Sequence, residues 1–316
     1  MGPRERRPLA ATFNHVLVDV DALAEEHPAL HQAVDLAARC GAKVTVVDVT
    51  EEVPEAARAY VSDRLERDLV ARRTEALDAV VAGERRRNVP VTAEVLRGRP
   101  AAAIVKFVLK ARVDLVVRSH ARDLSVKRPG FGSVDMQLLR KCPCPVWLVG
   151  VAERARPKRI LAAIHPDRDD PVEQALNHRI VEAARLIADL EKGSFTVLTA
   201  WSPYGESVLR SHMSPQELRA FVKAAKASAR AAFDELLADS GPLGRRGTVE
   251  IVKGQASTVI PAYAKRHDID LVVMGTVARG GLAGLLMGNT AERMLGQLRC
   301  SVFALKPEGF KSTIEA

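Results

Sequence analysis

Short runs rich in valine and leucine alternate along the chain with longer stretches in which apolar residues recur about every 3.6 positions. Each run is almost continuously apolar, which is typical of strands buried on both faces of a sheet. The longer stretches are typical of helices that cover a sheet with one face. In the first half we expect strands at 15–20, 44–49, 91–96, 114–117 and 145–149, and a long helical stretch at 55–88.

The second half repeats this alternation. Ser214 followed by Pro215 predicts a helix N-cap and a first helical position. Strands and helices that alternate through short connections predict a parallel sheet with right-handed crossovers. We expect strands at 159–164, 195–200, 249–253, 270–274 and 302–305, and helices at 171–191, 215–239, 256–267 and 289–298.

The two halves are copies of one unit. Segments 114–149 and 270–305 match at a constant offset of 156, whereas 16–21 matches 160–165 at an offset of 144. The pairs at the larger offset are Asp114 and Asp270, Gly98 and Gly254, Gly132 and Gly288, and Cys144 and Cys300. A period near 150 residues indicates a duplicated domain. We predict two tandem Rossmann-like α/β domains, 1–152 and 159–316, joined by a linker at 153–158, each a five-stranded parallel sheet of order 3-2-1-4-5 flanked by helices.

Composition narrows the classes of function. The 316 residues are 47% hydrophobic and only 4% aromatic, and the net charge of +8 divides into +4 for each half. An even charge distribution and few aromatic residues argue against nucleic-acid binding. Neither a signal peptide nor an apolar stretch of membrane-spanning length stands out, so we expect a cytoplasmic protein with no membrane contact. The four cysteines include Cys142 and Cys144, whose spacing fits neither a redox pair nor a zinc half-site, so we expect core thiols.

A glycine-rich segment marks the candidate binding site. In an open parallel sheet, ligands bind beyond the carboxyl ends of the strands where the strand order reverses, here between the first and fourth strands. The fourth strand of the second half leads into residues 275–290, which contain five glycines and then enter a helix. Such a loop favours a phosphate. The alternative is a flexible loop whose helix is capped by Asn289 or Thr290.

This segment resembles the signature loop G-x2-G-x9-G-[ST] of the universal stress protein family. The following AERML and the strand after Cys300 are also similar to that family, and GNTAE and LLRKCPCPVWLV resemble its E-type tandem branch. The resemblance covers nearly the whole chain in two copies. It implies the adenine nucleotide alpha hydrolase-like variant of the Rossmann fold, a role in stress adaptation, and an ATP site in some members.

In the second half the resemblance implies a nucleotide or phosphate site with several altered positions. Gly275 and Gly288 match the signature, Ala278 replaces its second glycine, and Asn289 replaces its serine or threonine. Thr290 follows one position later, His165 stands where the family has an aspartate after its first strand, and Gly254 falls in a region that lines the family's ligand crevice. ATP or another nucleotide is therefore one candidate ligand, and its identity stays open.

The first half departs from the signature in the opposite way. Asp21 matches the strand-one acid and Gly132-Ser133 matches the end of the loop, but Ser119 and Arg122 replace glycines. Gly98 follows the third strand as Gly254 does in the second half. The basic residues Arg118, Arg122, Lys127 and Arg128 could form a second anion site by their charge. The alternative is a solvated basic loop that binds no ligand.

The sequence also offers residues for a metal site and for an apolar pocket. His165 with Asp167, Asp169 and Asp170 resembles the start of a metal site, but we expect Asp169 or Asp170 to cap the helix before Pro171, and we expect no metal. The long helical stretches at 55–88 and 201–240 either cover the sheet or line an apolar pocket.

No catalytic motif is visible: nucleophile elbows and the loops of related nucleotide-using enzymes are missing from the sequence. We therefore expect a stress-response regulatory protein that binds a nucleotide or another phosphate-bearing small molecule mainly in its second half, without dedicated catalysis. Weak ATP hydrolysis is the most that the sequence allows. The alternative is a protein–protein interaction scaffold with vestigial nucleotide sites. By resemblance, the fifth strands (146–149 and 302–305) pair within one chain, and a homodimer is the other assembly that the family implies.

Overall fold

The computed structural model describes residues 13–53, 55–57, 60–84, 88–120, 131–150, 156–276 and 287–315. Two residues of the predicted sites, Arg122 and Ala278, lie outside this part of the chain. Residues 153–155 of the expected linker also lie outside it.

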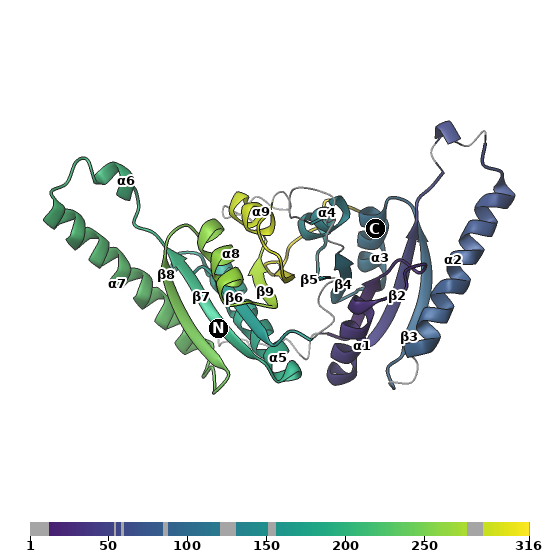
Figure 1. Cartoon of the computed structure of the whole chain (residues 1–316), viewed down its shortest axis with the longest axis horizontal. Coiled ribbons are helices and arrows are strands. Elements are labelled where there is room, and N and C mark those ends of the chain that lie inside the picture. Colours follow the sequence, from purple (N-terminus) through teal and green to yellow (C-terminus); the bar gives the residue numbers. More distant parts are fainter. Residues whose placement is uncertain are drawn as a thin grey trace.

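The first half contains five strands and its helices in the alternating order that the sequence predicts (Figure 1). Its strands are β1 (His15–Asp19), β2 (Lys43–Thr50), β3 (Val91–Arg97), β4 (Leu115–His120) and β5 (Val146–Gly150). Its helices are α1 (Pro28–Cys40), the 3₁₀ turn η2 (Glu55–Ala57), α2 (Asp63–Glu84), α3 (Pro100–Ala111) and α4 (Ser133–Lys141).

The second half repeats this order, with the short helix α6 where the first half has η2. Its strands are β6 (Arg159–Ile164), β7 (Ser194–Trp201), β8 (Gly247–Lys253), β9 (Leu271–Gly275) and β10 (Ser301–Leu305). Its helices are α5 (Pro171–Glu191), α6 (Glu206–Leu209), α7 (Pro215–Asp239), α8 (Ala256–Arg266) and α9 (Asn289–Leu295). The change of offset between the repeats lies partly in the first helix, because α1 has 13 residues and α5 has 21.

All ten strands form one sheet in the order β3-β2-β1-β4-β5-β10-β9-β6-β7-β8. Within each half the strands are parallel and the third, second, first, fourth and fifth strands lie side by side. The halves meet where β10 pairs antiparallel with β5, with Phe303 opposite Trp147. The two halves therefore lie on either side of this central ladder (Figure 1).

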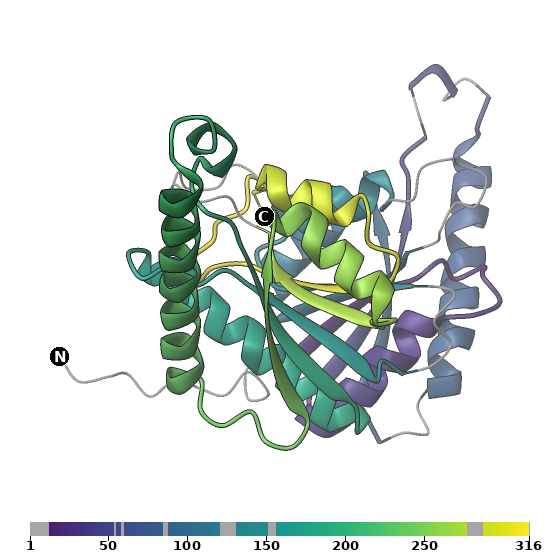
Figure 2. The same ribbon diagram turned by 60° about the vertical axis from the view of Figure 1, so that its left-hand side comes forward.

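Helices cover both faces of the sheet. Apolar side chains of α1, α2, α5 and α7 pack on one face, and those of α3, α4, α8 and α9 pack on the other. In Figure 2, α7 lies on one side of β8 and α8 on the other. Each half is thus a three-layer sandwich, the arrangement expected when every crossover between parallel strands contains a helix.

The repeated aspartates have the same structural role in both halves. Asp114 precedes β4, and its Oδ2 accepts the backbone N–H groups of Asn14 at 2.9 Å and His15 at 3.0 Å. Asp270 precedes β9, and its Oδ2 accepts those of Lys158 and Arg159, both at 2.8 Å. Each carboxylate thereby ties the start of a first strand to the start of a fourth strand.

Two predicted helix caps are confirmed. Asp170 Oδ1 accepts the N–H groups of Val172 at 2.9 Å and Glu173 at 3.0 Å, directly before Pro171 at the start of α5. Ser214 caps α7 and forms a capping box with Glu217.

One alternative and one expectation about helices were wrong. The N-cap of α9 is Gly288, and neither Asn289 nor Thr290 caps that helix. The stretch 55–88 is not one helix, because η2 and α2 are separate, and near its start Tyr60 is 88% exposed. Of the apolar residues of α2, only Leu77 and Val81 are fully buried, because η2 and the first turns of α2 extend beyond the sheet (Figures 1 and 2).

Candidate functional site

A cavity of about 940 Å³ opens at the carboxyl ends of the second-half strands. Its volume lies within the range of about 300–1,000 Å³ that is typical of small-molecule sites. Six residues predicted from the sequence line it together: His165, Gly254, Gly275, Gly288, Asn289 and Thr290. They come from four separate segments of the chain: the ends of β6, β8 and β9, and the start of α9. The cavity occupies the position where strand order reverses, because β6 pairs with β9.

The backbone at His165 is fixed by a buried amide. Asn177, in α5, is fully buried; its Nδ2 donates to the His165 carbonyl oxygen at 2.7 Å and its Oδ1 accepts the His165 N–H at 3.0 Å. Both backbone polar groups of this turn are therefore satisfied without solvent. Asn177 also lines the cavity, and it was missed because nothing in the sequence distinguishes it from the other polar residues of α5, such as His178.

Gly254 occupies a backbone conformation that other residues rarely adopt. Its φ is +143°, and its N–H donates to the carbonyl oxygen of Trp201 at 2.8 Å. The equivalent Gly98 in the first half has φ +119° and donates to Thr50 at 3.0 Å. The two glycines therefore make the same tight exit from the third strand, and in the second half this exit forms part of the cavity wall.

The ends of the glycine-rich loop are joined by a backbone hydrogen bond. The Gly288 N–H donates to the carbonyl oxygen of Thr276 at 3.2 Å, and Thr276 is fully buried. This contact holds the first turn of α9 beside the end of β9. Asn289 and Thr290 therefore border the same space as Gly275.

The floor and one wall of the cavity are apolar. Ala163, Met274 and Ala291 are buried on the floor side, at the ends of β6 and β9 and in the first turn of α9. Helix α7 supplies a wall of mostly small side chains: Phe221, Ala225, Ser228, Ala229 and Ala232. The sequence left open whether the helical stretch at 201–240 covers the sheet or lines an apolar pocket. Different parts of α7 do each. The middle of α7, from Phe221 to Ala232, lines the cavity, and Phe233 and Leu236 of the same helix are buried.

Charged groups gather on one side of the cavity. Asp167, Asp169 and Glu173 line it from the β6–α5 connection and the first turn of α5, and Arg168 pairs with Glu235 at 2.7 Å. In the described residues no group of three or more His, Cys, Asp or Glu side chains is arranged to hold a metal ion. The carboxylates therefore give this side of the cavity a negative electrostatic potential. A phosphate-binding site has a positive one.

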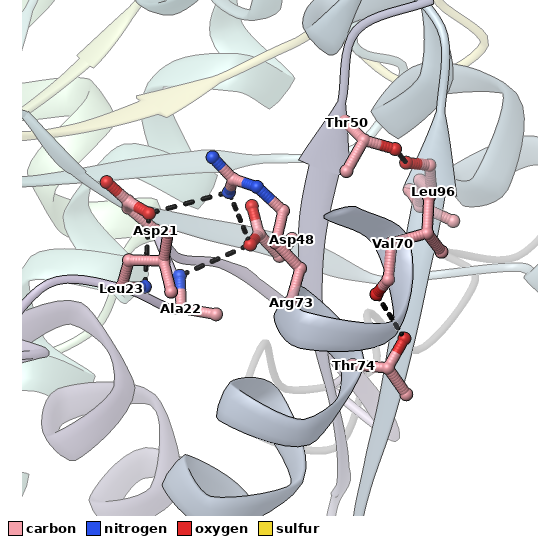
Figure 3. A network of polar contacts seen from close by, with 9 residues as sticks. All are labelled: Asp21, Ala22, Leu23, Asp48, Thr50, Val70, Arg73, Thr74 and Leu96. Carbon is pink, nitrogen blue, oxygen red and sulfur yellow. Dashed lines mark hydrogen bonds and ion pairs between the residues drawn. The ribbon is translucent and has the colours of Figure 1, made fainter. Parts of the chain in front are cut away.

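The first-half candidate residues are placed differently. Asp21 is exposed, and its Oδ1 accepts the N–H of Leu23 at 3.2 Å and lies 3.5 Å from Arg73 Nη1 (Figure 3). Gly132 is the N-cap of α4 and donates its N–H to Asp135 Oδ2 at 3.0 Å, while Ser133 is exposed. Polar groups of the first-half crevice are thus already hydrogen-bonded or ion-paired to side chains of the chain itself. Arg118 is one of the basic neighbours of Arg122 that the sequence offered for an anion, whereas Arg73 and Asp135 were not expected in this crevice.

Three of the cysteines are buried in the core. Cys142, Cys144 and Cys300 have almost no exposure, and burial raises the pKa of the Cys144 thiol well above its usual range. The Cys142 and Cys144 sulfur atoms lie 3.5 Å apart and are not bonded.

In the part of the chain that the structure describes, no helix is both long and apolar enough to cross a membrane.

Comparison with known proteins shows similarity over the whole chain. Universal stress protein E of Escherichia coli K12 is 25% identical over 310 residues, which cover 96% of this chain and 98% of that protein. The same protein from Photorhabdus laumondii is 24% identical over 315 residues, covering 97% and 99%. Both relatives span the two halves, so the duplication is common to all three chains.

Solved structures show the same fold. A crystal structure of a protein of unknown function from Pseudomonas aeruginosa PAO1 superposes with a TM-score of 0.74 at 24% identity, covering 96% of this chain and 95% of that one. A universal stress protein from Archaeoglobus fulgidus superposes with a TM-score of 0.63 at 16% identity, covering 93% and 98%. The model of the universal stress protein family matches residues 12–150 and again residues 157–306. The chain therefore belongs to the universal stress protein family and contains the family's domain twice.

Proposed function

We propose that this protein is a regulatory stress-response protein whose second half binds a nucleotide or another phosphate-bearing small molecule, without dedicated catalysis. The observation that carries the proposal is that the six described residues of the expected second-half site line one cavity of about 940 Å³. A chance grouping would not bring together residues that are more than one hundred positions apart, such as His165 and Gly288.

The charge distribution orients the ligand. Asp167, Asp169 and Glu173 repel a phosphate on the α5 side, while Gly275 and the first turn of α9 present no acidic side chain to the cavity there. The phosphate end therefore lies beside β9 and α9, and the sugar hydroxyls lie near the carboxylates, which accept hydrogen bonds from them. The apolar stretch of α7 then faces the remainder of the ligand.

A fluorescence titration tests the site directly. The chain has two tryptophans, and Trp201 lines the cavity whereas Trp147 lies in the central ladder. In a Trp147→Phe background, ATP should change the emission of Trp201 in a saturable manner. Gly288 has φ −65°, so other residues fit its backbone, and aspartate and asparagine are both good N-caps.

Gly288→Asp and Gly288→Asn therefore form a matched pair. Both should fold, and ATP should bind the aspartate variant at least about tenfold more weakly than the asparagine variant, because only the aspartate adds negative charge beside the phosphate. Equal affinities would place the phosphate elsewhere. Mass spectrometry of small molecules released on denaturation identifies the natural ligand.

The second candidate function is an interaction scaffold, and the ion pairs that fill the first-half crevice favour it for that half. In this proposal the antiparallel pairing of β5 with β10 joins two copies within one chain in place of a homodimer. Consistent absence of a released small molecule, together with no change in melting temperature on adding ATP, would favour the scaffold for the whole protein. We place the protein in the cytoplasm, in agreement with its reduced cysteines.

A further inference from the structure

The strand register assigns equivalent positions in the two crevices. Asp19 at the end of β1 lies opposite Arg118 of β4, and Ala163 near the end of β6 lies opposite Met274 of β9. On the following helices, Asp135 and Ala291 are each the third residue after the N-cap glycine, Gly132 and Gly288. Three positions at the base of each crevice can therefore be compared directly.

In the second half these three positions leave space. Ala163, Met274 and Ala291 are uncharged, and all three line the cavity. In the first half the same positions hold an ion triad: Arg118 pairs with Asp19, and its Nε lies 2.9 Å from Asp135 Oδ1. Asp19 and Asp135 are 3% and 4% exposed, so both carboxylates are buried, whereas Arg118 is half-buried.

The triad also occupies the polar groups that a ligand would need. Asp135 Oδ2 accepts the N–H of Gly132, the glycine that ends the family's signature loop, at 3.0 Å. A carboxylate of the chain itself therefore stands beside the first turn of α4, where the equivalent Ala291 leaves the second-half cavity open. Arg118, the residue best placed to attract an anion, already contacts two carboxylates.

A second ion cluster fills the outer part of the first-half crevice (Figure 3). Arg73 of α2 reaches over the strand ends, 2.6 Å from Asp48 Oδ2 and 3.5 Å from Asp21 Oδ1. Asp48 is buried at the end of β2, and the register places Thr199 at the equivalent position of β7. Thr199 lines the second-half cavity, and α7 presents alanines to that cavity where α2 sends its arginine.

Each cluster contains two carboxylates and one guanidinium, so each carries a net charge of −1 when ionised. In the first cluster both carboxylates are buried, and a buried net negative charge repels a phosphate strongly because the surrounding dielectric is low. Geometry and charge therefore both oppose an anionic ligand in the first half. We infer that Asp19, Arg118 and Asp135 form a built-in plug that closes the first-half crevice, so that these three positions decide which half of the chain binds a phosphate-bearing ligand.

This inference rests on the proposed function for its ligand but not for its geometry. ATP is the probe, and isothermal titration calorimetry measures its stoichiometry. The full-length protein should bind one ATP per chain. The variant with Asp19→Ala, Arg118→Met and Asp135→Ala places the second half's residues in the first half, and it should bind a second ATP or show a water-filled cavity at α4 in its crystal structure.

The reciprocal change closes the second half. Ala291→Asp copies Asp135, and Ala291→Asn adds nearly the same bulk without charge. ATP should bind Ala291→Asp at least about tenfold more weakly than Ala291→Asn. Equal binding by these two variants would contradict the role assigned to the carboxylate.

Two ATP molecules bound to the unaltered chain would overturn the inference, because the first half would then be open. If the unaltered chain binds no ATP, the proposed function fails for this probe. The crystal structure of the triple variant then decides the inference. A water-filled cavity supports it, and a collapsed crevice overturns it. If the triple variant does not fold, Asp135→Ala alone replaces it. Ordered water beside Arg118 then supports the plug, and closure of the space by neighbouring side chains contradicts it.

Discussion

Asn177 holds both backbone polar groups of His165, donating to its carbonyl oxygen at 2.7 Å and accepting its N–H at 3.0 Å. Because Asn177 is fully buried, Asn177→Leu leaves two backbone groups of His165 without these partners. We expect the free energy of unfolding to fall by about 2–4 kcal/mol. Urea unfolding followed by circular dichroism measures this change.

The control for this prediction lies on the same helix. Gln174 of α5 is only half-buried, so Gln174→Leu should change the free energy of unfolding by less than about 1 kcal/mol. A similar loss in both variants would mean that α5 is sensitive to any substitution and that the clamp on His165 has no special role.

Gly98 and Gly254 both have positive φ, but they differ in the space around the position of a Cβ atom. Gly98 has φ +119° and no atom within 4 Å of the position that a Cβ would occupy, whereas Gly254 has φ +143° and its Cβ would lie 2.8 Å from Val259 Cγ2. Gly98→Ala should therefore destabilise the protein by about 1–3 kcal/mol through strain alone. Gly254→Ala should destabilise it more, and comparison of the two urea midpoints tests this order.

Lys306 should make stability depend on alkaline pH. Burial lowers the pKa of its ammonium group from 10.5 to about 8, although the nearby Cys142 acts in the opposite direction. Between these pH values the unfolded chain holds a proton that the folded chain has lost, so stability rises with pH across this window. Below pH 8 both states are protonated and the penalty is complete.

The measurement compares the unaltered protein with Lys306→Met. The difference in unfolding free energy between them should move in favour of the unaltered protein as pH rises from about 8 to 10.5, by up to about 3 kcal/mol. The Lys306 ammonium group contacts the carbonyl oxygens of Leu139 and Arg140 at the end of α4, so the variant also loses a contact between the halves. A pH-independent difference would show that Lys306 titrates normally.

Phe303 joins the two halves at the centre of the sheet. Its ring centroid lies 5.8 Å from that of Trp147 and 6.4 Å from that of Phe13, and the side chain is 1% exposed. Phe303→Ala should lower the free energy of unfolding by about 3–5 kcal/mol and shift the emission of Trp147 to longer wavelength. Phe221→Ala, on the half-exposed cavity wall, should cost less.

The shape of the unfolding curve adds a second readout. If the β5–β10 ladder couples the halves, Phe303→Ala should turn one cooperative transition into two. A single unchanged transition in this variant would indicate that other contacts couple the halves, such as the ion pair between Arg140 and Glu292.

The sequence alone determined the architecture of each half and much of one site. Val- and Leu-rich runs reveal doubly buried strands because burial on both faces removes the polar alternation, and the predicted bounds of α5 and α7 match the structure. The glycine-rich loop after a strand end pointed to Gly275, Gly288, Asn289 and Thr290, because the carboxyl ends of parallel strands converge at one edge of a sheet. The family resemblance implied His165 and Gly254, which line the same cavity.

Only the tertiary structure decided which crevice is open. Asp21 and Gly132 match the family pattern in sequence, yet their crevice is filled by Arg73 and Arg118, whose partners come from other strands and helices. The alanines of α7 read in sequence as an ordinary helix face, and their place on a cavity wall depends on where that helix lies. Periodicity reports the burial of one segment at a time, whereas an open or filled cavity depends on side chains that distant segments bring together.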